Sequence, residues 1–140
     1  MKQIPVIFWT GTGNTQMMAD AVAEAINAAG AEAVVKNVSE ISADEAAGYD
    51  ALALGCPAMG AEVLEECEFE PFFTELEGKL AGKKVALFGS YGWGGTYMQD
   101  WEARVKVAGA TLVADGVLAL GAPDDEAMAK LAEAGKLLAE

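Results

Sequence analysis

The chain has 140 residues and carries 9 Lys or Arg against 22 Asp or Glu, a formal net charge of −13 with no histidine. So few cations exclude a nucleic-acid binder, which must neutralise phosphates, and they disfavour attachment to anionic lipid. The absence of histidine excludes Ser-His-Asp and Cys-His nucleophile systems and every zinc site that needs imidazole.

The length predicts one domain spanning residues 1–140. No apolar run approaches the roughly 20 residues of a membrane span, and the N-terminal apolar run is too short for a signal-peptide core. Cys56 and Cys67 form no Cys-x-x-Cys motif, which favours a reducing compartment. We therefore expect a cytoplasmic protein without a membrane segment.

Short apolar runs alternate with longer segments whose apolar residues recur at helical spacing. The strands are expected at residues 6–9, 33–38, 51–55, 85–89 and 111–120, the last broken or bent near Asp115-Gly116. The helices are expected at 15–29, 69–80 and 98–108, with a short helix or turn at 42–48 and a last helix after Pro123 whose inner stripe is Met128, Leu131, Gly135 and Leu138. Pro5 is expected to lead the first strand. This alternation predicts a three-layer α/β sandwich around a parallel sheet.

Parallel sheets bind ligands beyond the carboxyl ends of their strands. The loop after the first predicted strand reads Thr-Gly-Thr-Gly-Asn-Thr over residues 10–15. It is not a dinucleotide fingerprint, because Gln16 stands where a third Gly is needed, and without Lys it is not a Walker A loop. A tight turn with a Thr cap explains only one Thr and one Gly. Neutral donors at a helix N-terminus instead predict a phosphate site.

Two further loops, residues 55–62 and 89–95, follow the third and fourth predicted strands. Taken singly, Met59 is explained by gap filling at the core and Trp93 by a chance surface aromatic. Together, beside a phosphate loop, they predict two walls of a slot for a flat ring. A phosphate at one end and a ring at the other describe a mononucleotide.

These motifs resemble those of the short-chain flavodoxins of anaerobic bacteria. The resemblance rests on residues 10–15, on Cys-Pro-Ala-Met-Gly-x-Glu at 56–62, on Glu-Phe-Glu-Pro-Phe at 68–72 and on Ala-Leu-Phe-Gly-Ser-Tyr-Gly-Trp-Gly at 86–94, in order along the chain. It implies a doubly wound, flavodoxin-like α/β fold with a five-stranded parallel sheet in the order 2-1-3-4-5. It also implies one non-covalently bound FMN and a low-potential carrier that shuttles between quinone, semiquinone and hydroquinone to link redox enzymes.

The resemblance further implies which residues contact FMN. Residues 10–15 hold the phosphate, Met59 lies against the inner flavin face and Trp93 stacks on the outer face. Glu62 accepts a hydrogen bond from N3, and the Gly60 carbonyl turns toward N5 on the first reduction. The full predicted set is Thr10, Gly11, Thr12, Gly13, Asn14, Thr15, Ala58, Met59, Gly60, Ala61, Glu62, Ser90, Tyr91, Gly92, Trp93 and Gly94.

The chain departs from the family pattern in three places. Ala61 stands where several relatives carry Asp, and the segment 94–97 is one residue shorter. The loop 120–123 lacks polar side chains that could reach the ring, so it lies outside the predicted site.

Residues 61–77 hold seven acids and no base, namely Glu62, Glu65, Glu66, Glu68, Glu70, Glu75 and Glu77. A solvated helix face is the ordinary explanation of such a run. Beside a flavin loop, the same acids predict a strongly negative potential for the second electron and steering toward basic partners. Cys56 and Cys67 are assigned packing or loop roles.

Two other functions on this architecture are weighed against an electron carrier. An FMN-dependent quinone reductase needs room for a substrate on the flavin face, which a stacked Trp93 denies. A phosphorylated receiver domain needs acids after the first strand and an Asp after the third, where this chain has Phe8-Trp9 and Gly55-Cys56. We therefore predict a monomeric electron carrier, not an enzyme, with no catalytic or metal-binding residues. Its partners are expected to be reductases or oxidoreductases that also use ferredoxin and carry basic docking patches.

Overall fold

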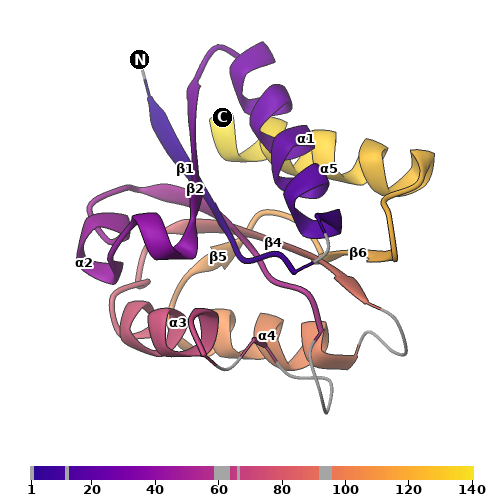
Figure 1. Cartoon of the computed structure of the whole chain (residues 1–140). Helices are drawn as coiled ribbons and strands as arrows, with labels where there is room; N and C mark the ends of the chain where they lie inside the picture. Colours follow the sequence, from indigo (N-terminus) through magenta and orange to yellow (C-terminus); the bar gives the residue numbers. More distant parts are fainter. Residues whose placement is uncertain (1, 12, 59–63, 66, 92–95) are drawn as a thin grey trace.

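The computed structural model describes residues 2–11, 13–58, 64–65, 67–91 and 96–140 (Figure 1). The strands are β1 (Gln3–Phe8), β2 (Glu32–Asn37), β3 (Ala51–Gly55), β4 (Lys84–Tyr91), β5 (Thr111–Leu112) and β6 (Val117–Leu120). The helices are α1 (Asn14–Ala28), the short 3-10 helix η1 (Val38–Glu40), α2 (Ala43–Ala46), α3 (Phe69–Glu77), α4 (Thr96–Val107) and α5 (Asp125–Ala139).

The sheet is parallel with the order β2-β1-β3-β4-β5, and β6 also pairs with β4. This confirms the predicted order and the predicted break in the last strand. Thr111–Leu112 lies beside the start of β4, and Val117–Leu120 lies beside its end. Between them the Gly116 amide donates to Glu102 Oε2 of α4 at 2.7 Å. The chain therefore leaves its pairing with β4 after β5 and pairs with β4 again in β6.

Pro5 lies inside β1 rather than ahead of it, so the predicted start of this strand is wrong by three residues. Backbone N–H groups alternate between the two sides of a strand. The Trp9 amide donates to the carbonyl of Gly55, the last residue of β3, which places the nitrogen of Pro5 on the same side of β1, the side of β3. Pairing with β3 begins only at Val6, so Pro5 removes no donor that the ladder uses.

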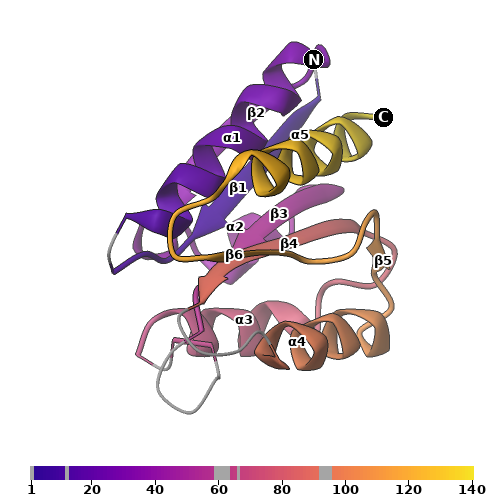
Figure 2. The ribbon, with the colours of Figure 1, turned by 90° about the vertical axis from the view of Figure 1, so that its right-hand side faces the viewer.

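Helices cover both faces of the sheet (Figures 1 and 2). One face packs against α1 and α5 through Met18, Val22 and Ile26 of α1 and the buried side of α5. The other packs against α2, α3 and α4. There Trp101 makes edge contacts with Phe69 and Phe73 at centroid distances of 5.5 and 5.8 Å.

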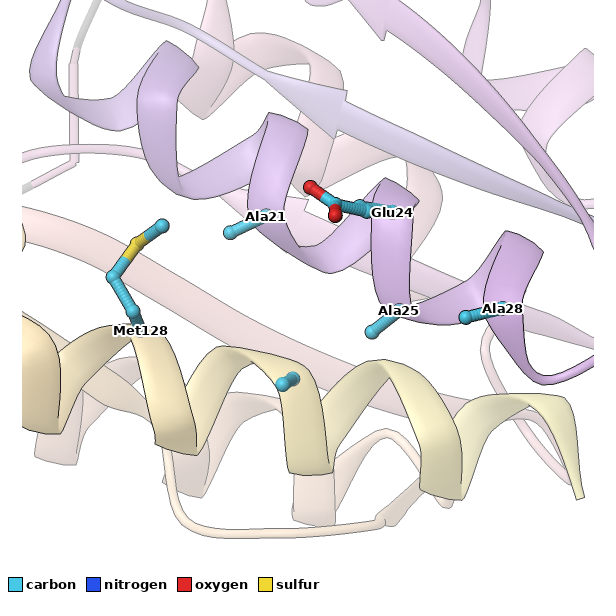
Figure 3. Close-up of a pocket in the computed structure, with 6 residues that line it drawn as sticks. Ala21, Glu24, Ala25, Ala28 and Met128 are labelled. Carbon is cyan, nitrogen blue, oxygen red and sulfur yellow. The ribbon is translucent and has the colours of Figure 1, made fainter.

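One residue of the predicted inner stripe of α5 is wrong. Met128 is 41% exposed, whereas Leu131, Gly135 and Leu138 are buried as predicted. The buried side of the helix starts one position earlier, at Ala127. Met128 instead lines a groove of about 250 Å³ between α1 and α5 (Figure 3), with Ala21, Glu24, Ala25, Ala28 and Ala132.

Among the residues that the structure describes, no helix is long and apolar enough to cross a membrane.

Candidate functional site

The three predicted loops begin at the carboxyl edge of the sheet, as the order of the strands requires. The Trp9 amide donates to Gly55 O at 3.0 Å, which joins the ends of β1 and β3. The Cys56 amide donates to Phe88 O at 3.1 Å and the Ala58 amide to Ser90 O at 3.0 Å, which continue the pairing of β3 with β4 beyond the strand. The segments after these strands therefore start side by side.

The first loop turns sharply into α1. The Gly13 amide donates to Thr10 Oγ1 at 2.9 Å, and Gly13 has φ +93°, a conformation that favours glycine. Thr10, Gly13 and Asn14 are half-buried and Gly11 is exposed. The loop is thus a backbone turn with its polar groups at the surface of the edge.

The N-terminus of α1 has no side-chain cap, and its first turn contains no acidic residue. In contrast, Asp124 caps α5, and Asp125 and Glu126 occupy its first turn. In a chain of charge −13, the positive end of the α1 dipole thus has no carboxylate in its own first turn. The donors and the dipole fit a phosphate group.

Thr15 links this helix to the end of β4. Its side chain is 1% exposed, and its Oγ1 lies 3.3 Å from Oγ of the buried Ser90. Either hydroxyl can donate in this pair. Both remain neutral, so they suit the negative phosphate without adding a charge.

The end of β3 is held rigidly against β4 and α4. Tyr97 donates its hydroxyl to Cys56 O at 2.8 Å, and a Cβ on Gly89 would lie only 2.1 Å from each of these two oxygen atoms. Burial raises the pKa of Cys56 to about 12 and also raises the pKa of Tyr97, so both stay protonated at neutral pH. Cys56 is therefore a buried, protonated thiol in the core, which agrees with the packing role predicted for it.

Ser90 and Tyr91 end β4, and Ala58 lies beside them as a half-buried residue. The Gly121 amide donates to Tyr91 O at 3.0 Å. The loop 120–123, which the sequence prediction left out, therefore lies next to the site, with Leu120 66% exposed. Its position depends on the β6–β4 pairing, which the composition of the loop does not encode.

The structure brings together Thr10, Gly11, Gly13, Asn14, Thr15, Ala58, Ser90 and Tyr91 from the predicted set. The other predicted residues lie outside the described part of the chain, so their roles stay predictions. These are Thr12, Met59, Gly60, Ala61, Glu62, Gly92, Trp93 and Gly94.

The acidic run is less uniform than its sequence indicates. Arg104 of α4 binds both oxygens of Glu70 at 2.7 and 2.9 Å and those of Glu77 at 3.1 and 3.0 Å. The hydrogen bonds from Arg104 lower the pKa of Glu70. Glu65 is buried and bonded to backbone amides. The run has no base in sequence, yet part of its charge is compensated in space.

Comparisons with known proteins agree with this geometry. The flavodoxin family model matches residues 6–135. A flavodoxin of Clostridium beijerinckii is 47% identical over 135 residues, covering 96% of this chain and 97% of the relative. The chain belongs to the flavodoxin family.

Solved flavodoxin structures extend the comparison to three dimensions. The solution structure of two-electron reduced Megasphaera elsdenii flavodoxin superposes with a TM-score of 0.90 at 42% identity, covering 97% of this chain and 98% of that one. The flavodoxin of that organism is also 46% identical over 116 residues, or 82% of this chain and 85% of the relative. Flavodoxins are electron carriers that bind FMN, so the quinone reductase alternative is not favoured.

Proposed function

We propose that residues 1–140 form one domain that binds a single FMN at the carboxyl edge of β1, β3 and β4. It carries electrons one at a time, at low potential, between redox proteins. The observation that supports this most directly is the N-terminus of α1, which has neither a side-chain cap nor an acid in its first turn and lies beside the buried Thr15–Ser90 pair.

The phosphate end of the site is formed by residues 10–15. Backbone N–H groups of the turn, the hydroxyls of Thr10, Thr12 and Thr15 and the Asn14 amide supply neutral donors. The dipole of α1 replaces the Lys of a Walker A loop. Thr15 holds its hydroxyl in place against Ser90, so this donor is oriented before the ligand arrives.

The ring end is formed by residues 58–62 and 90–94. Met59 and Trp93 pack on opposite faces of the ring and exclude water from it, and Glu62 accepts a hydrogen bond at the ring edge. Gly60 supplies a carbonyl whose orientation can change at low steric cost. Ala58, Ala61, Ser90, Tyr91, Gly92 and Gly94 form the two loops beside the ring. Bound FMN supplies the chemistry, the uptake and release of single electrons.

The remaining properties follow from charge. The acids of residues 61–77 that Arg104 leaves unpaired oppose further negative charge on the ring, which keeps the second potential low. They also favour partners with basic docking patches, such as reductases or oxidoreductases that also accept ferredoxin. We assign the protein to the cytoplasm, as a monomer.

The test is direct. The purified protein, loaded with FMN, should be yellow and should turn blue when it is half reduced. It should not sustain NAD(P)H oxidation by itself. Steady NAD(P)H oxidation would instead favour the quinone reductase. A colourless protein that binds no added FMN would overturn the proposal.

A further inference from the structure

The segment that leaves β3 is tied back to its own starting point. Residues 59–63 lie outside the described part of the chain, but both flanks are described. The Glu65 amide donates to Cys56 Sγ at 3.3 Å, nine residues away. Leu64 beside it is buried in the core. We call Cys56 and Glu65 the neck of the β3 loop.

The side chain of Glu65 fastens the neck to α3. It is 6% exposed, and its oxygens accept from the amides of Cys67 at 2.7 Å, Glu68 at 2.7 Å and Phe69 at 2.9 Å. Burial alone would raise its pKa, but the amides of Phe69, Glu68 and Cys67 lower it below the ordinary value. Glu65 is therefore a buried, charged residue held by backbone dipoles.

Capping α3 does not require a buried carboxylate. In α2 and α5 the caps are the exposed residues Ser42 and Asp124, each directly before the helix. In α3 the residue directly before the helix, Glu68, makes no side-chain cap, and Glu65 bonds the helix start from four residues upstream. Burying a charge is costly unless it is hydrogen-bonded, and three backbone amides bond this carboxylate. The extra feature here is that the Glu65 backbone also forms the neck.

We propose that Glu65 is a positioning residue for the FMN site, because it fixes the neck at the described ends of the segment to which the proposed function assigns contacts with the flavin ring. The proposal rests on the proposed function. Fixing both ends of a short loop lowers the entropy cost of placing its residues against a ligand. Loosening the neck should therefore weaken contacts to the ring and leave the phosphate end unchanged.

Three variants separate position from charge and from capping. Glu65→Asp keeps the charge but shortens the side chain, and Glu65→Gln keeps the length but loses the charge. Glu68→Gln is the matched control, since it removes one charge nearby from an exposed residue whose side chain accepts only from Trp9 Nε1, at 3.3 Å, among the bonds described. Its backbone amide still donates to Glu65.

The experiment measures dissociation constants for FMN and for riboflavin, which lacks the phosphate, and both one-electron potentials of the loaded protein. We expect Glu65→Asp and Glu65→Gln to weaken both ligands by about tenfold. The separation of the two potentials should change by about 60 mV, a tenfold change in a one-electron equilibrium. Glu68→Gln should weaken either ligand less than about twofold. In the ligand-free protein, the hydrogen-exchange rate of the Phe69 amide should rise in both Glu65 variants but not in Glu68→Gln.

The outcomes are distinguishable. A wild-type protein that binds no FMN overturns the proposed function itself. If the wild type binds FMN and the Glu65 variants lose only stability, with affinities and potentials like those of Glu68→Gln, then Glu65 is a helix cap alone and the inference fails. It also fails if Glu65→Asp matches the wild type while Glu65→Gln matches Glu68→Gln, because the loss of charge alone then explains both results.

Cys56→Ala opens the neck from its other side and should weaken both ligands by about threefold.

Discussion

At the scale of single residues, Thr15 has an environment that few polar residues share. It is buried in the first turn of α1, and its hydroxyl faces another buried hydroxyl, that of Ser90, at 3.3 Å. A buried hydroxyl stabilises a protein only modestly when it has one partner. The proposed function supplies a second partner for this pair, a phosphate oxygen of FMN.

Thr15→Ala should therefore weaken FMN binding by about tenfold, roughly the value of one hydrogen bond to a charged group. Riboflavin binding should stay within about twofold, because riboflavin lacks the phosphate. Fluorescence titration of both ligands measures the two constants. Thr15→Ser keeps the hydroxyl and should bind FMN nearly as the wild type does. Equal losses for FMN and riboflavin would show that Thr15 acts only through packing.

Arg104 gives a second prediction at the residue scale, on pH. Its hydrogen bonds lower the pKa of Glu70, so the pair stabilises the fold fully above the ordinary carboxylate pKa of about 4.3. This stabilisation is lost as the pH falls through the lowered pKa of Glu70. Glu70→Gln should cost about 1 kcal/mol at pH 7 and 5, and progressively less below about pH 4.

Urea unfolding of wild type and variant at pH 7, 5 and 3 measures this cost. Glu133→Gln, which removes an exposed charge from α5, controls for the general relief of repulsion at a net charge of −13. A cost that is the same at all three pH values would contradict the assigned ion pair.

The partners of Arg104 were not predictable from the sequence. Arg104 lies 27 residues from Glu77 and 34 from Glu70, and no spacing rule joins residues so far apart. The phosphate loop, in contrast, is a local pattern of six residues between a strand and a helix, and the structure places its described residues as predicted. Local motifs are readable because their geometry depends on neighbouring residues alone.

At the scale of elements, α1 and α5 pack side by side over one face of the sheet (Figure 1). Gly135 sets how closely they approach. A Cβ at this position would lie 2.7 Å from Val22 O and 2.9 Å from the Ala25 Cβ of α1. The helices are thus in backbone contact here, while small side chains further along leave the groove of Figure 3.

Gly135→Ala should destabilise the protein, because overpacking costs about 1 to 3 kcal/mol. The higher helix propensity of Ala offsets about 1 kcal/mol of that cost. Gly78→Ala is the matched control, because a Cβ there meets nothing within 4 Å and its φ is −73°. That variant should be neutral or slightly stabilised. Thermal unfolding of both variants gives the comparison. A stabilised Gly135→Ala would show that α5 can move away from α1 at little cost.

Most elements could be predicted from periodicity, but their edges and their exposed sides could not. The predicted start of β1 is wrong because a proline is tolerated inside a strand wherever the sheet needs no hydrogen bond from its nitrogen. Whether such a bond is needed at Pro5 depends on where the pairing with β3 begins. Met128 was placed inside because it is apolar, yet the buried side of α5 is chosen by contact with α1 and the sheet. Tertiary contacts decide between equally apolar positions.

At the scale of the whole molecule, acids lie at two of the helix starts near the carboxyl edge of the sheet. Lys2 and Lys84 donate to the carbonyl oxygens of Leu138 and Glu140 at the C-terminal end of α5, near the amino ends of β1 and β4. Glu65 and Glu70 lie at the start of α3, and Asp125 and Glu126 in the first turn of α5, both near the carboxyl edge. Each arrangement also suits the adjacent helix dipole. The edge that bears the proposed FMN site therefore has acids in the first turns of two helices, α3 and α5, in a molecule of charge −13.

The acids at this edge predict how electron transfer depends on salt. The reduced protein should react with a basic cytochrome through attraction at its acidic edge, and the rate should fall about tenfold between about 10 and 150 mM ionic strength, as the Debye length shrinks from about 30 to about 8 Å. Ferricyanide also oxidises the reduced protein but is an anion. Repulsion from the same edge should therefore make the rate of oxidation by ferricyanide rise with salt. Stopped-flow oxidation with both oxidants measures the two slopes. Because the FMN and its potentials are the same in the two reactions, opposite slopes isolate the surface charge. Slopes of the same sign, or a cytochrome rate that does not respond to salt, would contradict this prediction. They would mean that Arg104 compensates so much of the acidic charge that the remaining field at the edge cannot steer a partner.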